Sequence, residues 1–121
     1  AAMRLGDAAA DAALGRTGTV PPPGATVFTY VAIPPDDDAG HAPASASADF
    51  HVEEDGRMHR TDTIDYGVLL EGELWLELDD GREQLLRAGD CFVQNGTRHA
   101  WRNRGSEPAL MCVAMVGVAR R

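Results

Sequence analysis

Histidine and carboxylate side chains stand close together in the segment HRTDTID, which runs from His59 to Asp65. Side chains of an extended chain alternate between two faces, so His59 and Thr61 share one face. A second histidine, His99, shares its face with Trp101 further along the chain. Imidazole and carboxylate groups bind divalent metal ions and transfer protons near neutral pH, so these residues form the candidate chemical site.

The elements that must position these residues are short strands. From Asp49 onward the chain consists of short apolar and β-branched runs separated by Glu-Gly, Asp-Gly and Gly-Asp pairs. This pattern is typical of strands joined by tight turns, and about eight of them suit a small barrel or jelly roll. A further strand, from Ala25 to Ile33, is expected at a sheet edge. The other expected strands cover residues 49–52, 58–61, 64–70, 73–78, 83–87, 91–94, 99–102 and 109–118.

The length of 121 residues favours one domain with one core. We expect an N-terminal arm over residues 1–24, with a short helix between Gly6 and Gly15, and a β-barrel domain over residues 25–121. No apolar run approaches the roughly 20 residues of a membrane-spanning helix, and the N-terminus lacks a secretory signal pattern. The sequence therefore predicts a cytoplasmic protein that does not enter the membrane.

Charge and composition narrow the function further. The formal net charge of −8 opposes binding to nucleic acid and to anionic membrane surfaces. All eleven basic residues are arginines, so mechanisms that use a lysine Schiff base or a lysine base are excluded. Cys91 and Cys112 are too few for a disulfide framework, and we interpret both as reduced core residues.

Two spaced motifs in the second half of the chain resemble those of the cupin superfamily. The first motif has the order His, His, Glu and Gly, and its spacing is kept at His59, Thr61, Asp65 and Gly72. The second motif is one residue shorter than usual and is matched at Gly89, Gly96, His99 and Asn103. The resemblance implies an all-β fold, the cupin double-stranded β-helix or jelly-roll barrel, with the motif side chains gathered at one barrel mouth.

The resemblance also implies a metal site, which in this family holds iron, manganese, nickel or zinc with three histidines and one carboxylate. Here Thr61 stands at the position of the second histidine, and Asp65 replaces the glutamate. The remaining donors, His59, Asp65 and His99, have the composition of a two-histidine, one-carboxylate site. Because aspartate is one methylene shorter than glutamate, the strand would have to shift inward, or Gln94 would have to supply a ligand.

Two other interpretations of the barrel mouth are open. In one, Asp65 or Asp62 orients a histidine that acts as general acid or base without a metal. In the other, the histidines and the aspartate only hydrogen-bond one another and water. His51 is a further candidate ligand if its strand lies next to His59.

Aromatic residues are few, so their positions are informative. Trp101 is expected to wall an apolar pocket for a small organic molecule beside His99, and with Thr61 and Gln94 it forms the predicted ligand-binding or cofactor-binding set. Trp75 is expected outside the barrel or at a dimer interface. Three arginines flank the motif residues and are interpreted as solvated charges or as anchors for a substrate carboxylate: Arg60, Arg98 and Arg102.

The resemblance implies a small-molecule enzyme, an oxidoreductase or decarboxylase-like cupin that depends on a divalent metal. The alternative is a non-catalytic cupin that binds or senses a small ligand without metal, since the fold alone does not decide between them. We also expect a homodimer, because an exposed first strand and the apolar final strand ALMCVAMVGV offer edges and faces that need cover.

Overall fold

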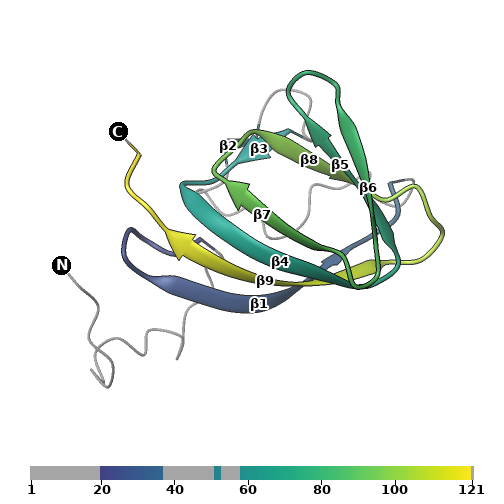
Figure 1. The fold of residues 1–121 in the computed structure, drawn as a ribbon, viewed down its shortest axis with the longest axis horizontal. Helices are drawn as coiled ribbons and strands as arrows, with labels where there is room; N and C mark the ends of the chain where they lie inside the picture. Colours follow the sequence, from purple (N-terminus) through teal and green to yellow (C-terminus); the bar gives the residue numbers. More distant parts are fainter. Residues whose placement is uncertain (1–19, 37–50, 53–57, 121) are drawn as a thin grey trace.

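The computed structural model of the chain describes residues 20–36, 51–52 and 58–120 (Figure 1). Every regular element in these ranges is a β-strand, so they hold no helix that is long and apolar enough to cross a membrane. The predicted helix between Gly6 and Gly15 lies outside the described residues, and the arm over residues 1–24 stays a prediction. The strands are β1 (Thr26–Ile33), β2 (His51–Val52), β3 (His59–Arg60), β4 (Thr63–Glu71), β5 (Glu73–Leu78), β6 (Glu83–Arg87), β7 (Cys91–Asn95), β8 (His99–Arg102) and β9 (Ala109–Gly117).

The strands form two antiparallel sheets that curve around a common interior (Figure 1). The β4 sheet has the order β1-β9-β4-β7, and the β8 sheet has the order β2-β3-β8-β5-β6. The chain changes sheet between β1 and β2, between β3 and β4, between β4 and β5, and again at each step from β6 to β9. Such crossing between two sheets is the jelly-roll arrangement, so the predicted all-β barrel is confirmed. The predicted first strand lies at a sheet edge, as β1.

Local turns decide where the strands begin and end. Gly72 joins β4 to β5 with a φ of 83°, a conformation that residues with a Cβ rarely adopt. The strand predicted over residues 58–61 is shorter in the structure, because β3 ends at Arg60. The chain bends there toward the β4 sheet, and the hydroxyl oxygens of Thr61 and Thr63 lie 2.6 Å apart across the bend.

The buried side chains divide the barrel interior into an apolar region and a polar region. The strand β4 contributes to both, because it buries Thr63 and Asp65 near its start and Leu69 near its end. The apolar region consists of Leu69, Leu74, Leu86, Ala109, Met111, Val113 and Met115. The polar region consists of Thr61, Thr63, Asp65, Gln94 and His99.

Both cysteines project from the outer side of the β4 sheet. Cys91 on β7 and Cys112 on β9 are each a register partner of Val68 on β4. Since Gln94 is buried on β7, alternation turns Cys91 outward. Cys91 is exposed and Cys112 half-buried, and both are free thiols. The interpretation of both cysteines as core residues is therefore wrong.

Candidate functional site in the polar region of the barrel

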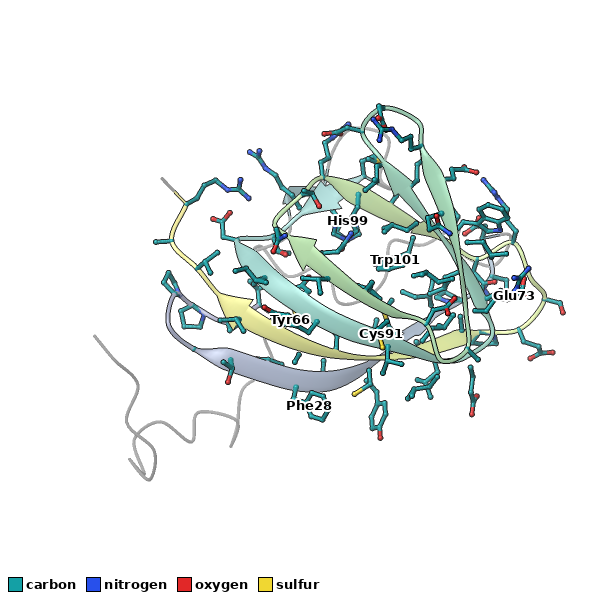
Figure 2. The ribbon with its side chains drawn as sticks, viewed as in Figure 1. Phe28, Tyr66, Glu73, Cys91, His99 and Trp101 are labelled. Carbon is teal, nitrogen blue, oxygen red and sulfur yellow. The ribbon has the colours of Figure 1, made fainter. Side chains whose placement is uncertain are left out.

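His59 and His99 meet because the strands that carry them pair directly. Their Cα atoms are register partners between β3 and β8, and paired residues project their side chains from the same face of a sheet. The two ring centroids lie 4.4 Å apart, with the rings edge-on. His99 is buried inside the barrel (Figure 2), whereas His59 is half-buried, so the pair is approached from the side of His59.

The protonation state of His99 follows from its neighbours. Its Nδ1 lies 2.7 Å from the backbone carbonyl oxygen of Thr97, which only accepts hydrogen bonds, so Nδ1 carries the proton. Burial and, to a smaller extent, the charge of His59 lower the pKa of His99 to about 4, although the Thr97 carbonyl raises it. At neutral pH His99 is therefore uncharged, and its Nε2 presents a lone pair.

Asp65 projects into the barrel from β4 and is buried. Burial raises the pKa of its carboxyl group, while a hydrogen bond with Thr63 and the charge of nearby His59 lower it in part. In the described part of the chain, Oδ1 of Asp65 has no hydrogen-bond partner. An unsatisfied buried oxygen costs about 1–3 kcal/mol, so Asp65 at this position lowers the stability of the folded chain.

The other predicted polar residues surround this carboxylate. Gln94 on β7 is the register partner of Asp65 and is buried in the same interior. Thr61, which stands in place of a motif histidine, is also buried, and its hydroxyl is joined to that of Thr63. His51 pairs with Arg60 through β2 and β3. The structure thus buries Thr61 and Gln94 in the polar region together with Asp65.

Two aromatic rings form a wall beside the histidines. The ring centroids of Trp101 and His99 lie 6.0 Å apart, and those of Trp101 and Phe92 lie 5.0 Å apart. The Phe92 ring covers Gly67, where an added Cβ would lie only 2.1 Å from the ring. Sequence reasoning missed Phe92, although its alternation with the buried Gln94 places it on the inner face.

The predicted metal ligands are not assembled into one cluster. Within residues 20–36, 51–52 and 58–120, no three His, Cys, Asp or Glu side chains are grouped so that they would hold a metal ion. His59 and His99 are together, but Asp65 projects from the other sheet and is hydrogen-bonded to Thr63. As arranged here, the donors do not fit a three-ligand metal centre, and no chemical step is assigned to a metal.

Asn103 is a buried motif residue with a structural role. Its Nδ2 donates to the carbonyl oxygens of Ile33 at 2.9 Å and Glu107 at 2.8 Å, and its Oδ1 accepts from the amide of Gly105 at 3.0 Å. These bonds fasten the loop after β8 to the end of β1. Both polar atoms of its side chain have partners within the protein, in contrast to Oδ1 of Asp65.

The arginines and Trp75 lie outside the polar region. Arg102 donates to Glu77 at 2.6 Å, and Arg98 pairs with Asp79. The guanidinium of Arg104 lies 5.0 Å from the ring centroid of Trp75, which is half-buried. Arg102 and Arg98 therefore already have carboxylate partners within the protein.

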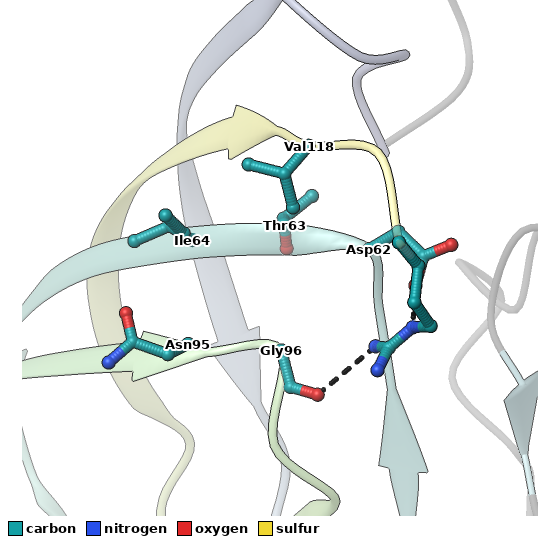
Figure 3. A pocket seen from close by; sticks show the side chains of 7 residues that line it. Asp62, Thr63, Ile64, Asn95, Gly96 and Val118 are labelled. Atoms are coloured by element: carbon teal, nitrogen blue, oxygen red, sulfur yellow. Dashed lines mark hydrogen bonds and ion pairs between the residues drawn. The ribbon is translucent and has the colours of Figure 1, made fainter.

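A separate pocket of about 260 Å³ lies where β4 begins and β7 ends (Figure 3). Arg120 spans it, because its Nε donates to Asp62 at 2.6 Å and its Nη2 donates to the Gly96 carbonyl at 3.2 Å. Neither His59 nor His99 lines this pocket. Its charged groups satisfy each other, so we assign the candidate site to the histidine pair instead.

Comparison with known proteins gives the family. A family model described as Cupin domain matches residues 46–116. The chain is 60% identical over 47 residues to phomopsin biosynthesis cluster protein C' of Diaporthe leptostromiformis, which covers 39% of this chain and 25% of that protein. It is 42% identical over 57 residues to a cupin-domain-containing oxidoreductase of Hypocrea virens, covering 45% and 29%. The chain thus matches little more than a quarter of the length of these relatives.

A solved structure shows the same fold. The sugar phosphate isomerase from a cupin superfamily of Silicibacter pomeroyi has a TM-score of 0.51 and 22% identity, covering 75% of this chain and 50% of that one. At this identity the likeness concerns the fold alone. Because the family model matches more than half of the 121 residues and the barrel has the same architecture, this chain belongs to the cupin-domain family.

Proposed function

We propose that the polar region of the barrel binds a small organic molecule that carries a hydrogen-bond donor and an aromatic or apolar part. The observation that carries this proposal is the buried His99, whose Nδ1 is held by the Thr97 carbonyl, so that the lone pair of its Nε2 is left to accept a hydrogen bond. Trp101 and Phe92 offer an apolar wall next to it. A hydroxyl or N–H group of the ligand then faces Nε2, and its ring packs against Trp101.

The geometry supports binding by His99 more than general base catalysis. A base works best when its pKa lies near the working pH, and a pKa of about 4 makes His99 a weak base at neutral pH. In addition, its Nδ1 is hydrogen-bonded to a backbone carbonyl and not to Asp65 or Asp62. The interpretation in which a carboxylate orients this imidazole therefore receives no support at His99.

A metal-dependent oxidoreductase is the second candidate function. Relatives in Hypocrea virens and Neurospora crassa carry the name cupin-domain-containing oxidoreductase. In this chain the unpartnered Oδ1 of Asp65 is the observation that favours a cation, because buried carboxylate oxygens are commonly satisfied by one. Since Asp65 and the two histidines are not grouped as a three-ligand site among the described residues, this candidate requires Asp65 to move toward His59 and His99 before iron, manganese, nickel or zinc could be held.

Phenol is a suitable probe of the first proposal, since it joins one hydroxyl to one aromatic ring. The chain has two tryptophans, so the Trp75→Phe variant leaves Trp101 as the sole tryptophan reporter. Phenol is expected to change Trp101 fluorescence in a saturable way, and His99→Gln in the same background is expected to weaken binding at least tenfold. Gln84→Ala, at an exposed position of β6, is the matched control. Unchanged affinity in the His99 variant would refute the proposal.

Cobalt(II) is the probe of the second candidate, because its visible absorption reports coordination. The expected result is one ion per chain, lost in His59→Ala and His99→Ala and weakened in Asp65→Ala. Asp62→Ala is the matched control, since Asp62 is paired with Arg120 at the separate pocket. Elemental analysis of protein purified without chelator or His-tag gives the native metal. Absence of cobalt binding to the wild-type chain would eliminate the metal-dependent function.

A further inference from the structure

The outer face of the β4 sheet is an uncharged surface that crosses all four strands. Register partners on neighbouring strands project from the same face, so the outward side chains form rows. The middle row consists of Phe28, Ala114, Tyr66 and Val93. The flanking rows consist of Thr26, Val116, Ile64 and Asn95 on one side, and of Tyr30, Cys112, Val68 and Cys91 on the other. We call these three rows the outer face, and none of their residues carries a charge.

The large side chains of the outer face are exposed. The exposed fraction is 78% for Phe28, 69% for Tyr30, 54% for Tyr66 and 55% for Val93. Figure 2 shows Phe28 pointing away from the barrel interior. Within the described ranges, all exposed large hydrophobic residues lie in strands of the β4 sheet, with Leu70 as the fifth.

The β8 sheet is different, because ion pairs lie along it. Arg102 pairs with Glu77 between β8 and β5, and Arg98 pairs with Asp79 close to the ends of the same strands. Among the described residues, this sheet has no exposed large hydrophobic side chain. The exposed apolar surface is therefore a property of one sheet and not of the barrel as a whole.

The size of the outer face suits a protein interface. Four strands spaced by about 4.8 Å and three rows spaced by about 6.8 Å cover on the order of 400 Å² in projection. The solvent-accessible area is larger than this projected area, because the aromatic side chains protrude from the sheet and Leu70 and Leu110 adjoin it. A specific interface buries about 600–1,000 Å² per partner, so the outer face is of the order that one partner of a small dimer contributes.

The charge and shape of the outer face favour a second copy of the same chain as its occupant. With a net charge of −8, two copies avoid direct repulsion when they meet through a surface that has no charge. The small Ala114 and Cys112 on β9 lie between larger side chains, Phe28 and Tyr30 on β1 and Tyr66 on β4. Phe28 and Tyr30 thus form a ridge, and Ala114 and Cys112 form a trough beside it. After a two-fold rotation the ridge of one copy faces the trough of the other, as an isologous interface requires.

We propose that two copies of this chain associate through the outer face of the β4 sheet, with the Phe28 and Tyr30 ridge of each seated over Ala114 and Cys112 of the other. The sequence predicts a dimer from the exposed first strand and the apolar final strand, and this proposal identifies the face involved. It is independent of the ligand in the barrel, because outward and inward side chains alternate along each strand.

Sedimentation velocity of the full chain tests the proposal from low to high micromolar concentration. The wild-type chain is expected to sediment as a dimer. Tyr66→Asp places a charge at the centre of the outer face and is expected to weaken association about a hundredfold or more. Phe28→Ser on the edge strand β1 is a milder second variant, expected to weaken it about tenfold. Gln84→Asp adds the same charge at an exposed position of β6, in the other sheet, and is expected to leave the dimer intact.

The folding control for each variant is far-ultraviolet circular dichroism together with thermal unfolding, both of which report the barrel itself. A wild-type chain that is monomeric at every concentration would overturn the proposal. A dimer that both Tyr66→Asp and Phe28→Ser leave unchanged would overturn it as well. Appearance of a dimer only after removal of residues 1–19 would show that the chain's own N-terminal segment covers the outer face, which also contradicts the proposal.

Discussion

The two regions of the barrel interior differ in how completely their groups are satisfied. The apolar region, around Leu74 and Leu69, consists of side chains that need only close packing, and both leucines are fully enclosed. The polar region buries Asp65 with one oxygen unpartnered, and holds His99 neutral against its ordinary pKa. The buried Asp65 carboxylate opposes folding at neutral pH, whereas the lowered pKa of His99 opposes folding only as the pH falls below 6.5.

This difference indicates that the apolar region stabilises the fold and that the polar region binds the ligand. Each unsatisfied or desolvated polar group in the polar region lowers the free energy of unfolding by on the order of 1–3 kcal/mol. Packing in the apolar region offsets this loss. Proteins retain such groups most often where they bind or react. Changes in the apolar region are therefore expected to reduce stability and spare the ligand, and changes in the polar region are expected to do the reverse.

The largest effect is expected from Leu74→Ala in the apolar region. Leu74 has an exposed fraction of 0%, and its truncation leaves a cavity between the sheets, at a cost of about 2–5 kcal/mol. Urea unfolding measures this cost, and phenol binding is expected to be unchanged. Leu85→Ala, at a half-buried position of β6, is the matched control and should cost less than half as much. Equal losses in the two variants would mean that the apolar region is not the main core.

A pH effect of similar size is expected in the polar region. The pKa of His99 is lowered from 6.5 to about 4 in the folded state, so the unfolded chain binds more protons between these values. Stability therefore falls as the pH decreases from 6.5 to about 4, by roughly 3 kcal/mol from this group. The raised pKa of Asp65 acts in the opposite direction, since its contribution is lost as the pH rises through that pKa.

The difference between the wild-type chain and His99→Gln isolates the histidine contribution, because both keep Asp65. Unfolding by urea at several pH values, in buffer with a chelator, supplies the two curves. The wild-type curve should fall more steeply below pH 6.5. Parallel curves would mean that His99 titrates normally and that its environment is polar and hydrated.

Substitution of Asn103, a buried polar residue whose side-chain atoms all have partners, should lower stability and leave ligand affinity unchanged, as in the apolar region. Asn103→Ala leaves two carbonyl oxygens and one amide without their partner, and we expect a loss of about 2–3 kcal/mol with no change in ligand affinity. Asn103→Asp keeps the acceptor for Gly105 and removes both donors, so it should lose most of the same amount. Thermal unfolding and phenol titration check the two expectations, and a weakened phenol affinity would place Asn103 in the ligand site.

The smallest effect on stability is expected from Asp65→Asn in the polar region. The substitution removes a buried charge whose formation is unfavourable at neutral pH, so stability should stay equal or rise by about 1 kcal/mol. Cobalt or phenol binding should weaken in the same variant. Thr63→Val is the companion variant, because it removes the hydroxyl that bonds to Asp65 and keeps the carboxylate. A strong loss of stability in Asp65→Asn would show that the carboxylate is structural.

Local sequence patterns predicted the strands and the meeting of the two histidines. Alternation and glycine turns depend only on near neighbours, so β5 and β6 have the predicted bounds and β4 extends its prediction by one residue at each end. The common face of His59 and Thr61, together with the cupin motifs, placed His59 near His99, and the two are register partners.

Features that depend on register between distant strands escaped prediction. The outward direction of Cys91 follows from its position opposite Val68 on β4, and the hydrogen bonds of Asn103 depend on Ile33, which is 70 residues away in the sequence. The tautomer of His99 depends on the orientation of the Thr97 carbonyl. These contacts are set by which strands become neighbours, and no local pattern carries that information.

Nuclear magnetic resonance of the imidazole nitrogens of His99, recorded from acid to neutral pH, tests the central claim most directly. The structure predicts an uncharged ring at neutral pH with the proton on Nδ1, an unprotonated Nε2, and a pKa of about 4. Addition of phenol is expected to shift the Nε2 signal while Nδ1 stays protonated. A ring protonated on Nε2 at neutral pH, or one that titrates near its ordinary pKa of 6.5, would contradict the account.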